Sequence, residues 1–521
     1  MGKKILEIIL FFIVCSNVFA DEFSRSEYYV KEDGSGTKDG TSWANAMPSS
    51  TFAKALSTMS TLKSGVTFHL AAGTYYPMYD PFPEEHVNYS DEEKECFKVY
   101  YVQTPINIIG GYSKNPKDGE KPNPSINETI ISGDLKENDV EGDRSTNIND
   151  DLFNLFNIDL KEKDQCSFFG LTLKRTRARK AGDDGVFRIG GYSGYKETGS
   201  VLKLDRCIMS YVSKTTSGAT IDGDDELIAT NCTFERSYCQ FYNKKSQFNS
   251  CTFIGDYPPL VAGILIVKNC TFYDCYFTIG INKKTIFHNN TIVNNVENGS
   301  VTISSYSSSS NDEDETDPEI SLIGNIFDCK LTCYTYDNCV LKSRYNLYRE
   351  VDENMSKRIS FDYDYMPTYI EEIFEKNWED KPILKDNGGY TKTIKLISDQ
   401  LPEADDCRSI RYDKKVTNLA TDQRGVTRLD NTCMGSYEKN YTEITIPTAF
   451  TPFDSNNKND VFMQGYEVYI YDIYGMLVTH TTNGWNGKVN GEMADAGIYI
   501  YAVKLQSGEI RKGSIELLMP R

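Results

Sequence analysis

One short phrase recurs through the middle of the chain, and it restricts the possible folds more than any other feature. It reads Asn231-Cys232-Thr233-Phe234, then Ser250-Cys251-Thr252-Phe253, then Asn269-Cys270-Thr271-Phe272. Weaker copies are centred on positions 207, 290 and 325, so the successive intervals are 25, 19, 19, 20 and 35 residues. One short β phrase about every 20 residues is typical of a parallel β-solenoid, whose coils are stable only when they stack on neighbours of the same shape.

The order of residues inside the phrase predicts which side chains face the interior. Successive residues of a strand point to opposite faces, so Cys232 and Phe234 share one face and Thr233 lies on the other. Because cysteine is small and apolar, we expect an interior ladder formed by Cys207, Cys232, Cys251 and Cys270. Disulfides are the alternative, and three spacings leave it open: Cys270 with Cys275, Cys329 with Cys333, and Cys407 with Cys433.

Length, composition and charge are consistent with many short strands. The chain has 521 residues, more than one compact core usually holds, so we expect two or three domains, or one extended repeat domain plus an appended domain. Only 39% of residues are hydrophobic and 35 are tyrosine, which favours strands with polar turns over a helical bundle. The formal net charge of −19 argues against binding to nucleic acid or to anionic membranes.

The first 20 residues have the layout of a secretory signal peptide. Lys3 and Lys4 precede an apolar run, 5–14, that is too short for a spanning helix, and Ala20 provides a small residue before the mature chain. Cys15 would suit lipidation, but the preceding residue is a bulky valine, so we expect cleavage after Ala20. The sequence therefore predicts an exported protein that is secreted or attached to the outer cell surface.

Motifs at both ends of the repeat region resemble a known family. Asp39-Gly40-Thr41-Ser42-Trp43, a short helix over 52–62, a strand over 66–70 and Ala72-Gly73-Thr74-Tyr75 resemble the opening of right-handed parallel β-helix proteins of the pectate-lyase-like superfold. Asn387-Gly388-Gly389-Tyr390-Thr391, Asp422-Gln423-Arg424-Gly425 and Met434-Gly435-Ser436-Tyr437-Glu438 resemble the closing region of the choice-of-anchor Q domain. The resemblance covers about 28–438 and implies one right-handed β-helix domain over 21–438.

The segment 443–521 has a different pattern of alternating, tyrosine-rich strands and a tryptophan turn, which predicts a small β-sandwich. It is similar to the gliding-motility-associated C-terminal domain, the type B sorting signal of type IX secretion in Bacteroidetes. The similarity departs from the usual pattern at Thr448 and over 453–458, where an Asn-Gly-Asp-Gly turn is typical. It implies delivery to the cell surface through the secretion machinery. The matching positions are Pro447, Phe450, Thr451, Pro452, Asn459, Asp460, Trp485, Gly487, Gly497, Tyr499, Lys512 and Gly513.

Residues that could support catalysis are few. The four histidines, at 69, 86, 288 and 480, have no spacing typical of a zinc site or a triad, and we expect His69 to face solvent. Polysaccharide lyases of the resembled superfold use a basic residue and Asp-bound Ca²⁺ to abstract a proton next to a carboxylate. The candidates here are Arg177, Lys180, Asp183 and Asp184 for catalysis, and Asp222, Asp224 and Asp225 for metal. Solvated turns of a solenoid, where Asp and Gly are favoured, explain both clusters more simply.

Three functions fit these observations. We expect a monomeric, non-catalytic surface protein that binds a polysaccharide or another host or extracellular ligand, with no cofactor. The alternatives are a polysaccharide lyase or hydrolase acting on an acidic glycan, with Ca²⁺ if it is a lyase, and a structural surface spacer. The fold cannot choose among them, because one scaffold can host all three.

Overall fold

The computed structural model describes residues 23, 25–57, 62–140, 143, 146–160, 163–177, 185–189, 199–212, 221–222, 226–236, 241–255, 259–275, 277–295, 300–305, 318–334, 339–352, 360–402, 409–439, 446–452, 460–504 and 510–519. The signal-peptide prediction falls outside these residues. No helix in the described part of the chain has the length and apolar character needed to cross a bilayer.

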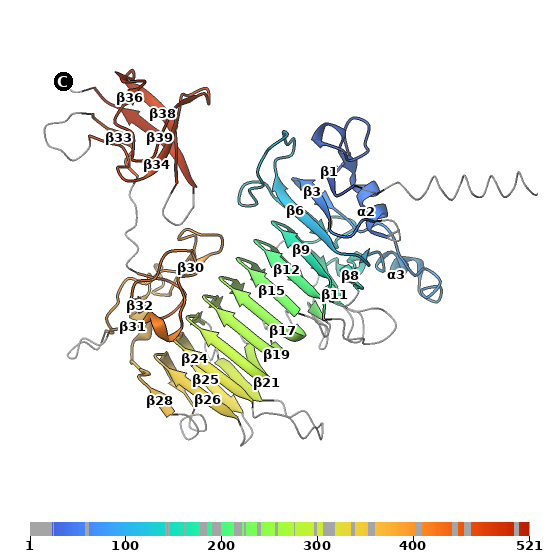
Figure 1. The fold of residues 1–521 in the computed structure, drawn as a ribbon. Coiled ribbons are helices and arrows are strands. Elements are labelled where there is room, and N and C mark those ends of the chain that lie inside the picture. Colours follow the sequence, from blue (N-terminus) through green and yellow to red (C-terminus); the bar gives the residue numbers. More distant parts are fainter. Residues whose placement is uncertain are drawn as a thin grey trace, which may run out of the picture.

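Most described strands belong to a parallel β-solenoid (Figure 1). The first series of parallel pairings runs through β1 (Glu27–Lys31), β3 (Val66–Ala71), β6 (Ile106–Tyr112), β9 (Gln165–Phe169), β12 (Val201–Asp205), β15 (Glu226–Thr230), β17 (Phe241–Asn249), β19 (Pro259–Lys268), β21 (Phe277–His288), β24 (Glu319–Ile323), β26 (Val340–Arg344) and β28 (Ser360–Asp362). This series confirms the predicted parallel stacking of coils.

Two further series complete each coil. The second runs through β4 (Gly73–Tyr75), β7 (Thr129–Ser132), β10 (Thr172–Thr176), β13 (Ile208–Val212), β16 (Thr233–Glu235), β18 (Thr252–Ile254), β20 (Thr271–Tyr273), β22 (Thr291–Val293), β25 (Ile326–Tyr334) and β27 (Leu347–Val351). The third links β5 (Tyr100–Val102), β8 (Asn154–Ile158), β11 (Gly185–Ile189), β14 (Ile221–Asp222), the first halves of β17, β19 and β21, β23 (Ser300–Ser305) and the second halves of β25 and β27.

The repeated phrase forms the ladders that the sequence predicts. Cys207, Cys232, Cys251 and Cys270 are buried and carry free thiols, so the interior ladder is confirmed. Burial away from water raises the pKa of the first three of these thiols well above the ordinary value. Stacked phenylalanines accompany them, with ring centroids 4.7 Å apart for Phe234 and Phe253 and 4.6 Å apart for Phe253 and Phe272. None of the three suggested disulfides forms, because Cys270, Cys329 and Cys433 are free thiols.

The cysteine ladder continues as an asparagine ladder in the later coils. The side-chain oxygen of Asn290 accepts from the backbone N–H of Cys270 at 2.9 Å, and that of Asn325 accepts from the N–H of Asn290 at 2.9 Å. Asn346 does the same for Asn325 at 2.9 Å, and Asp364 for Asn346 at 2.6 Å. The weaker copies of the phrase therefore occupy the same place in the coil as the cysteines.

A short helix covers the first coils. This helix is α2 (Ser49–Ser57), and it follows η1 (Trp43–Asn45) and β2 (Met47–Pro48) in the chain. A second short helix, α3 (Asp91–Glu95), begins after Ser90, which forms a capping box. The ring of Phe52 lies 5.1 Å from that of Phe68 and 5.3 Å from that of Tyr100. The predicted helix over 52–62 is thus present, but it starts three residues earlier, and 58–61 lie outside the described residues.

The segment 382–438, called the closing segment below, lies along the flank of the solenoid. It contains the hairpin strands β29 (Leu384–Lys385) and β30 (Thr393–Ile394), and β31 (Arg411–Asp413) and β32 (Asn431–Cys433). Gln423 of the closing segment bonds to two outward-facing threonines of the repeated phrase. The Thr271 hydroxyl donates to the side-chain oxygen of Gln423 at 2.6 Å, and the side-chain nitrogen of Gln423 donates to the Thr252 hydroxyl at 2.8 Å. The segment therefore covers the middle coils, over β18, β20 and β22.

The C-terminal residues form a second β unit with its own core. Its five-stranded sheet has the order β33 (Ala449–Phe450), β39 (Ile510–Leu517), β38 (Gly497–Lys504), β34 (Glu467–Tyr471) and β35 (Leu477–Thr481). A hairpin of β36 (Lys488–Val489) and β37 (Glu492–Met493) accompanies the sheet. Trp485, Phe450 and Phe462 are in a hydrophobic cluster that contains no solenoid residue. A separate all-β unit is therefore present, while the predicted two-layer sandwich stays a prediction.

Candidate functional site

The predicted lyase residues fall mostly outside the described part of the chain. Five of them lie outside the described residues: Lys180, Asp183, Asp184, Asp224 and Asp225. Asp222 is the last residue of β14 and pairs through its backbone with Tyr242. The predicted lyase groove therefore stays a prediction.

Arg177, the remaining lyase candidate, has structural partners. Its Nη2 lies 3.3 Å from the sulfur of Cys96, and its guanidinium lies over the ring of Phe153 at 4.9 Å. The cation thus packs between side chains at the edge of the third series of strands.

The predicted sorting residues lie in and around the C-terminal sheet. Pro447 precedes β33, Thr451 and Pro452 follow it, Tyr499 lies in β38, and Lys512 and Gly513 lie in β39. Asn459 lies outside the described residues. Gly487 has a φ of +78°, and a Cβ added there would lie 2.6 Å from Pro452 Cγ, so this turn requires glycine for both reasons. The glycine at this matched position therefore has a structural reason of its own.

His69 does not face solvent as the strand pattern predicts. Its ring stacks on Tyr29 at 5.0 Å, and its Nδ1 lies 2.8 Å from the hydroxyl of Tyr112. Its side chain is only 14% exposed, and burial lowers its pKa. The prediction is wrong because a tyrosine and tryptophan cluster covers the outer face of these first coils.

Two segments cover the outer side of the second series of strands, one over its early coils and one over its middle and later coils, and a short stretch between them stays uncovered. The loop 113–128 lies beside its early coils, where Pro124 and Ser125 line the same cavity as Thr172 of β10. The closing segment covers its middle and later coils. Between these covers, Ile208 on β13 is 39% exposed. The gap leaves a cavity of about 110 Å³, called the flank cavity, whose lining includes Glu128, Thr172, Arg206, Ile208, Asn231 and Tyr390.

The flank cavity combines an aromatic ring with charged and amide groups. Tyr390 is 50% exposed, and the guanidinium of Arg206 lies 3.5 Å from the centre of its ring. No described residue accepts a hydrogen bond from the buried Nε of Arg206. The Nδ2 of Asn231 donates to the Asp205 carboxylate at 3.3 Å, and the carboxylate of Glu128 accepts from the hydroxyl of Thr172 at 3.1 Å. The walls therefore offer both donors and acceptors beside one aromatic face.

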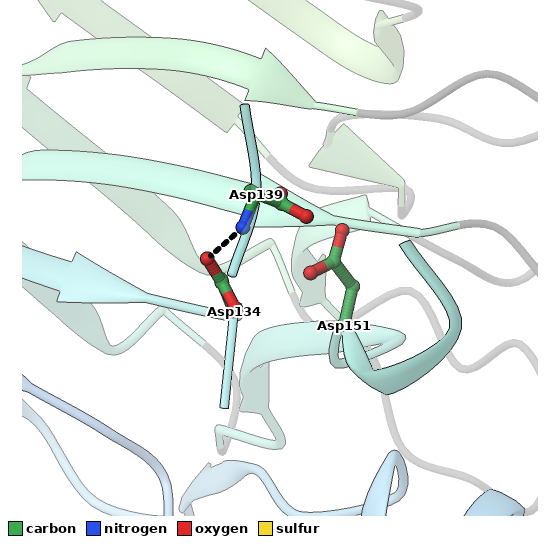
Figure 2. A group of neighbouring side chains, drawn as sticks. All are labelled: Asp134, Asp139 and Asp151. Carbon is green, nitrogen blue, oxygen red and sulfur yellow. Dashed lines mark hydrogen bonds between the residues drawn. The ribbon is translucent and has the colours of Figure 1, made fainter. Parts of the chain in front are cut away.

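A second site, the acidic cluster of Asp134, Asp139 and Asp151, was not predicted from the sequence (Figure 2). One carboxylate oxygen from each residue lies within 4.8 Å of the other two. Burial, followed by repulsion from Asp139 and Asp134, raises the pKa of Asp151 to about 8. Burial also raises the pKa of Asp139, against the opposite effect of Arg175. The available signal was the acidic pair 150–151 before a strand, which is also common in ordinary turns.

By its fold, the protein belongs to the all-β class, with a long parallel β-solenoid and a separate C-terminal β unit. No protein-family model and no curated protein matches it.

Proposed function

We propose that the protein is an exported surface protein whose solenoid binds a carbohydrate at the flank cavity. The observation that carries this proposal is the half-exposed ring of Tyr390 beside the charged and amide groups of the cavity. Sugars present apolar ring faces and hydroxyl groups, so they are recognised by an aromatic surface next to hydrogen-bonding side chains. The cavity has these features in one place.

The size and charge of the cavity narrow the class of ligand. One water needs about 10–15 Å³ of such space, so about 110 Å³ suits one sugar unit, with the rest of a glycan lying outside. The Arg206 side chain lines the cavity and is 28% exposed, so its guanidinium favours a sugar that carries an acceptor, such as a carboxylate. Glu128 is exposed and accepts from hydroxyl groups. We infer that an acidic or strongly hydroxylated glycan fits best.

Export and surface delivery are part of the same proposal. They are supported by the signal-like residues 1–20 and by the resemblance of 443–521 to a type IX sorting domain. The secretion machinery would be the partner of the C-terminal unit, and the protein would act as a monomer.

The proposal is tested by binding of the chain from residue 21 onward to a glycan array that includes uronate polymers. We expect Tyr390→Ala to weaken binding to the best glycan at least tenfold, about 1.4 kcal/mol, because the stacking surface is lost. Tyr334→Ala is the matched control, since Tyr334 is 64% exposed and lies outside the cavity lining. Equal loss in both variants, or no binding to any glycan, would contradict the proposal.

The same polymers separate binding from catalysis. A lyase releases an unsaturated uronate product that absorbs ultraviolet light, whereas a binding protein leaves the polymer intact. Product release that depends on Ca²⁺ would support the lyase alternative.

A further inference from the structure

The acidic cluster is held by ordered elements of the solenoid. Asp134 follows β7, Asp151 precedes β8, and the two residues form a backbone bridge with each other. The carboxylate of Asp134 accepts from the backbone N–H groups of Asn138 and Asp139, at 3.2 and 3.1 Å. Figure 2 shows the carboxylates of Asp139 and Asp151 turned toward each other. Protein contacts alone therefore bring the three side chains together.

Two of these carboxylates, Asp139 and Asp151, differ from an ordinary surface cluster because their side chains are buried and accept few hydrogen bonds. Asp151 is 1% exposed, and the side chain of Asp139 is 2% exposed. Among the described residues, none donates a hydrogen bond to Oδ1 of Asp151 or to either carboxylate oxygen of Asp139. Burying a carboxylate with few hydrogen bonds is costly, so a bound cation or a proton must compensate its charge.

One protein cation lies beside the cluster and does not neutralise it. Arg175 Nη1 is 3.1 Å from Oδ2 of Asp139. The same guanidinium donates to the carbonyls of Asp143 and Val140, at 2.8 and 2.9 Å, and lies 4.3 Å from the ring centre of Tyr211. When all three carboxylates are ionised, as in a metal-bound state, they leave two negative charges beside this one guanidinium, which a divalent cation would balance.

We propose that Asp134, Asp139 and Asp151 bind a Ca²⁺ ion that fastens the loop between β7 and β8 to the solenoid. Carboxylate oxygens are the ligands that hard cations prefer, and Ca²⁺ binds them at about 2.3–2.6 Å in flexible geometry. Two oxygens on opposite sides of Ca²⁺ are then about 5 Å apart, so a spread of up to 4.8 Å already suits this ion. Mg²⁺ needs about 2.0–2.1 Å and a strict octahedron and gives up its waters reluctantly, so a site built from protein carboxylates favours Ca²⁺.

This site is independent of the carbohydrate proposal. The cluster contains none of the residues that line the flank cavity, and none of the acidic residues 222, 224 and 225 that the sequence suggested. Its expected role is to hold the loop in place, so its test has readouts of metal binding and stability.

The test uses the chain from residue 21 onward, treated with a chelator and then titrated with Ca²⁺ or Mg²⁺ by calorimetry and thermal unfolding. We expect one Ca²⁺ per chain and a rise in melting temperature of several degrees, with weaker binding of Mg²⁺. Asp151→Asn should weaken Ca²⁺ binding at least tenfold and abolish the thermal shift. This variant should fold, because asparagine resembles the protonated carboxyl in size and removes a buried charge.

Asp91→Asn is the matched control, because it removes the same charge from a fully exposed side chain and should leave Ca²⁺ binding unchanged. Asp139→Asn is a second variant that should also lose the ion. Absence of Ca²⁺ binding in the folded wild-type chain would overturn the proposal, and so would equal binding by wild type and Asp151→Asn. In either case a shared proton, and not a metal, would compensate the cluster.

Discussion

At the scale of single residues, the polar ladder inside the later coils should contribute more to stability than the cysteine ladder before it. Asn325 is fully buried, and its Nδ2 donates to the carbonyl of Phe287 at 2.7 Å, while its Oδ1 accepts from the backbone N–H of Asn290 at 2.9 Å. Asn325→Ala would leave these buried groups without partners, and we expect it to lower the free energy of unfolding by about 3 kcal/mol. Cys251→Ala, at the same place in an earlier coil, should cost about 1 kcal/mol, because its sulfur makes only weak hydrogen bonds. Denaturant unfolding of both variants checks this, and similar losses would contradict it.

A second prediction at this scale concerns pH. The pKa of Asp151 is raised to about 8 by burial and by Asp139 and Asp134, with Asp150 adding to the rise and Arg175 opposing it. In the unfolded chain the carboxyl has its ordinary pKa, so below about pH 4 both states are protonated and folding is not penalised. From there to about pH 8 only the unfolded state loses the proton, so the stability of the calcium-free protein should fall by up to about 1.4 kcal/mol per pH unit.

Comparison with Asp151→Asn isolates this effect from the other titrating groups. The variant should lack this part of the slope, and saturating Ca²⁺ should remove it from the wild-type chain. The measurement is the midpoint of urea unfolding between pH 5 and 8 with a chelator present. Parallel curves for the two proteins would show that Asp151 does not titrate in this way.

At the scale of elements, local patterns predict the coils well and the packing between distant segments poorly. The phrase around Cys232 predicts its strand, its inward face and its place in the stack, because one coil contacts the next about 20 residues along. The path of the closing segment could not be predicted, because the hydrogen bond from Thr271 to Gln423 joins residues 152 positions apart. The flank cavity depends on that path, since Tyr390 meets Arg206 only when the closing segment folds back. The acidic cluster likewise forms only when the loop after β7 brings Asp134 beside Asp151.

At the scale of the whole molecule, the two β units should be separable. The solenoid completes its own polar network at Glu438, which is buried and accepts from the hydroxyl of Thr432 at 2.5 Å and from the backbone N–H of Cys433 at 3.0 Å. Arg428 is fully buried in the same network and donates to the side chain of Asn269 at 2.9 Å. All of these groups precede the segment 443–521, whose core is a separate hydrophobic cluster. Units with separate cores generally fold alone.

Deletion of 443–521 should therefore leave a folded solenoid that its native host no longer delivers to the cell surface. We expect the melting temperature of the remaining unit to change by no more than about 2 °C, because it loses none of the contacts around Glu438. Trp485→Ala provides a second route to the same result, since it removes a fully buried ring and should cost the C-terminal unit about 3–5 kcal/mol while leaving the solenoid intact. Surface proteolysis and cell fractionation measure delivery, and thermal unfolding of the purified chains measures folding. If the truncated protein reached the surface in normal amounts, the C-terminal unit would not be a sorting signal, and its exposed side chains would have to be tested for ligand binding instead.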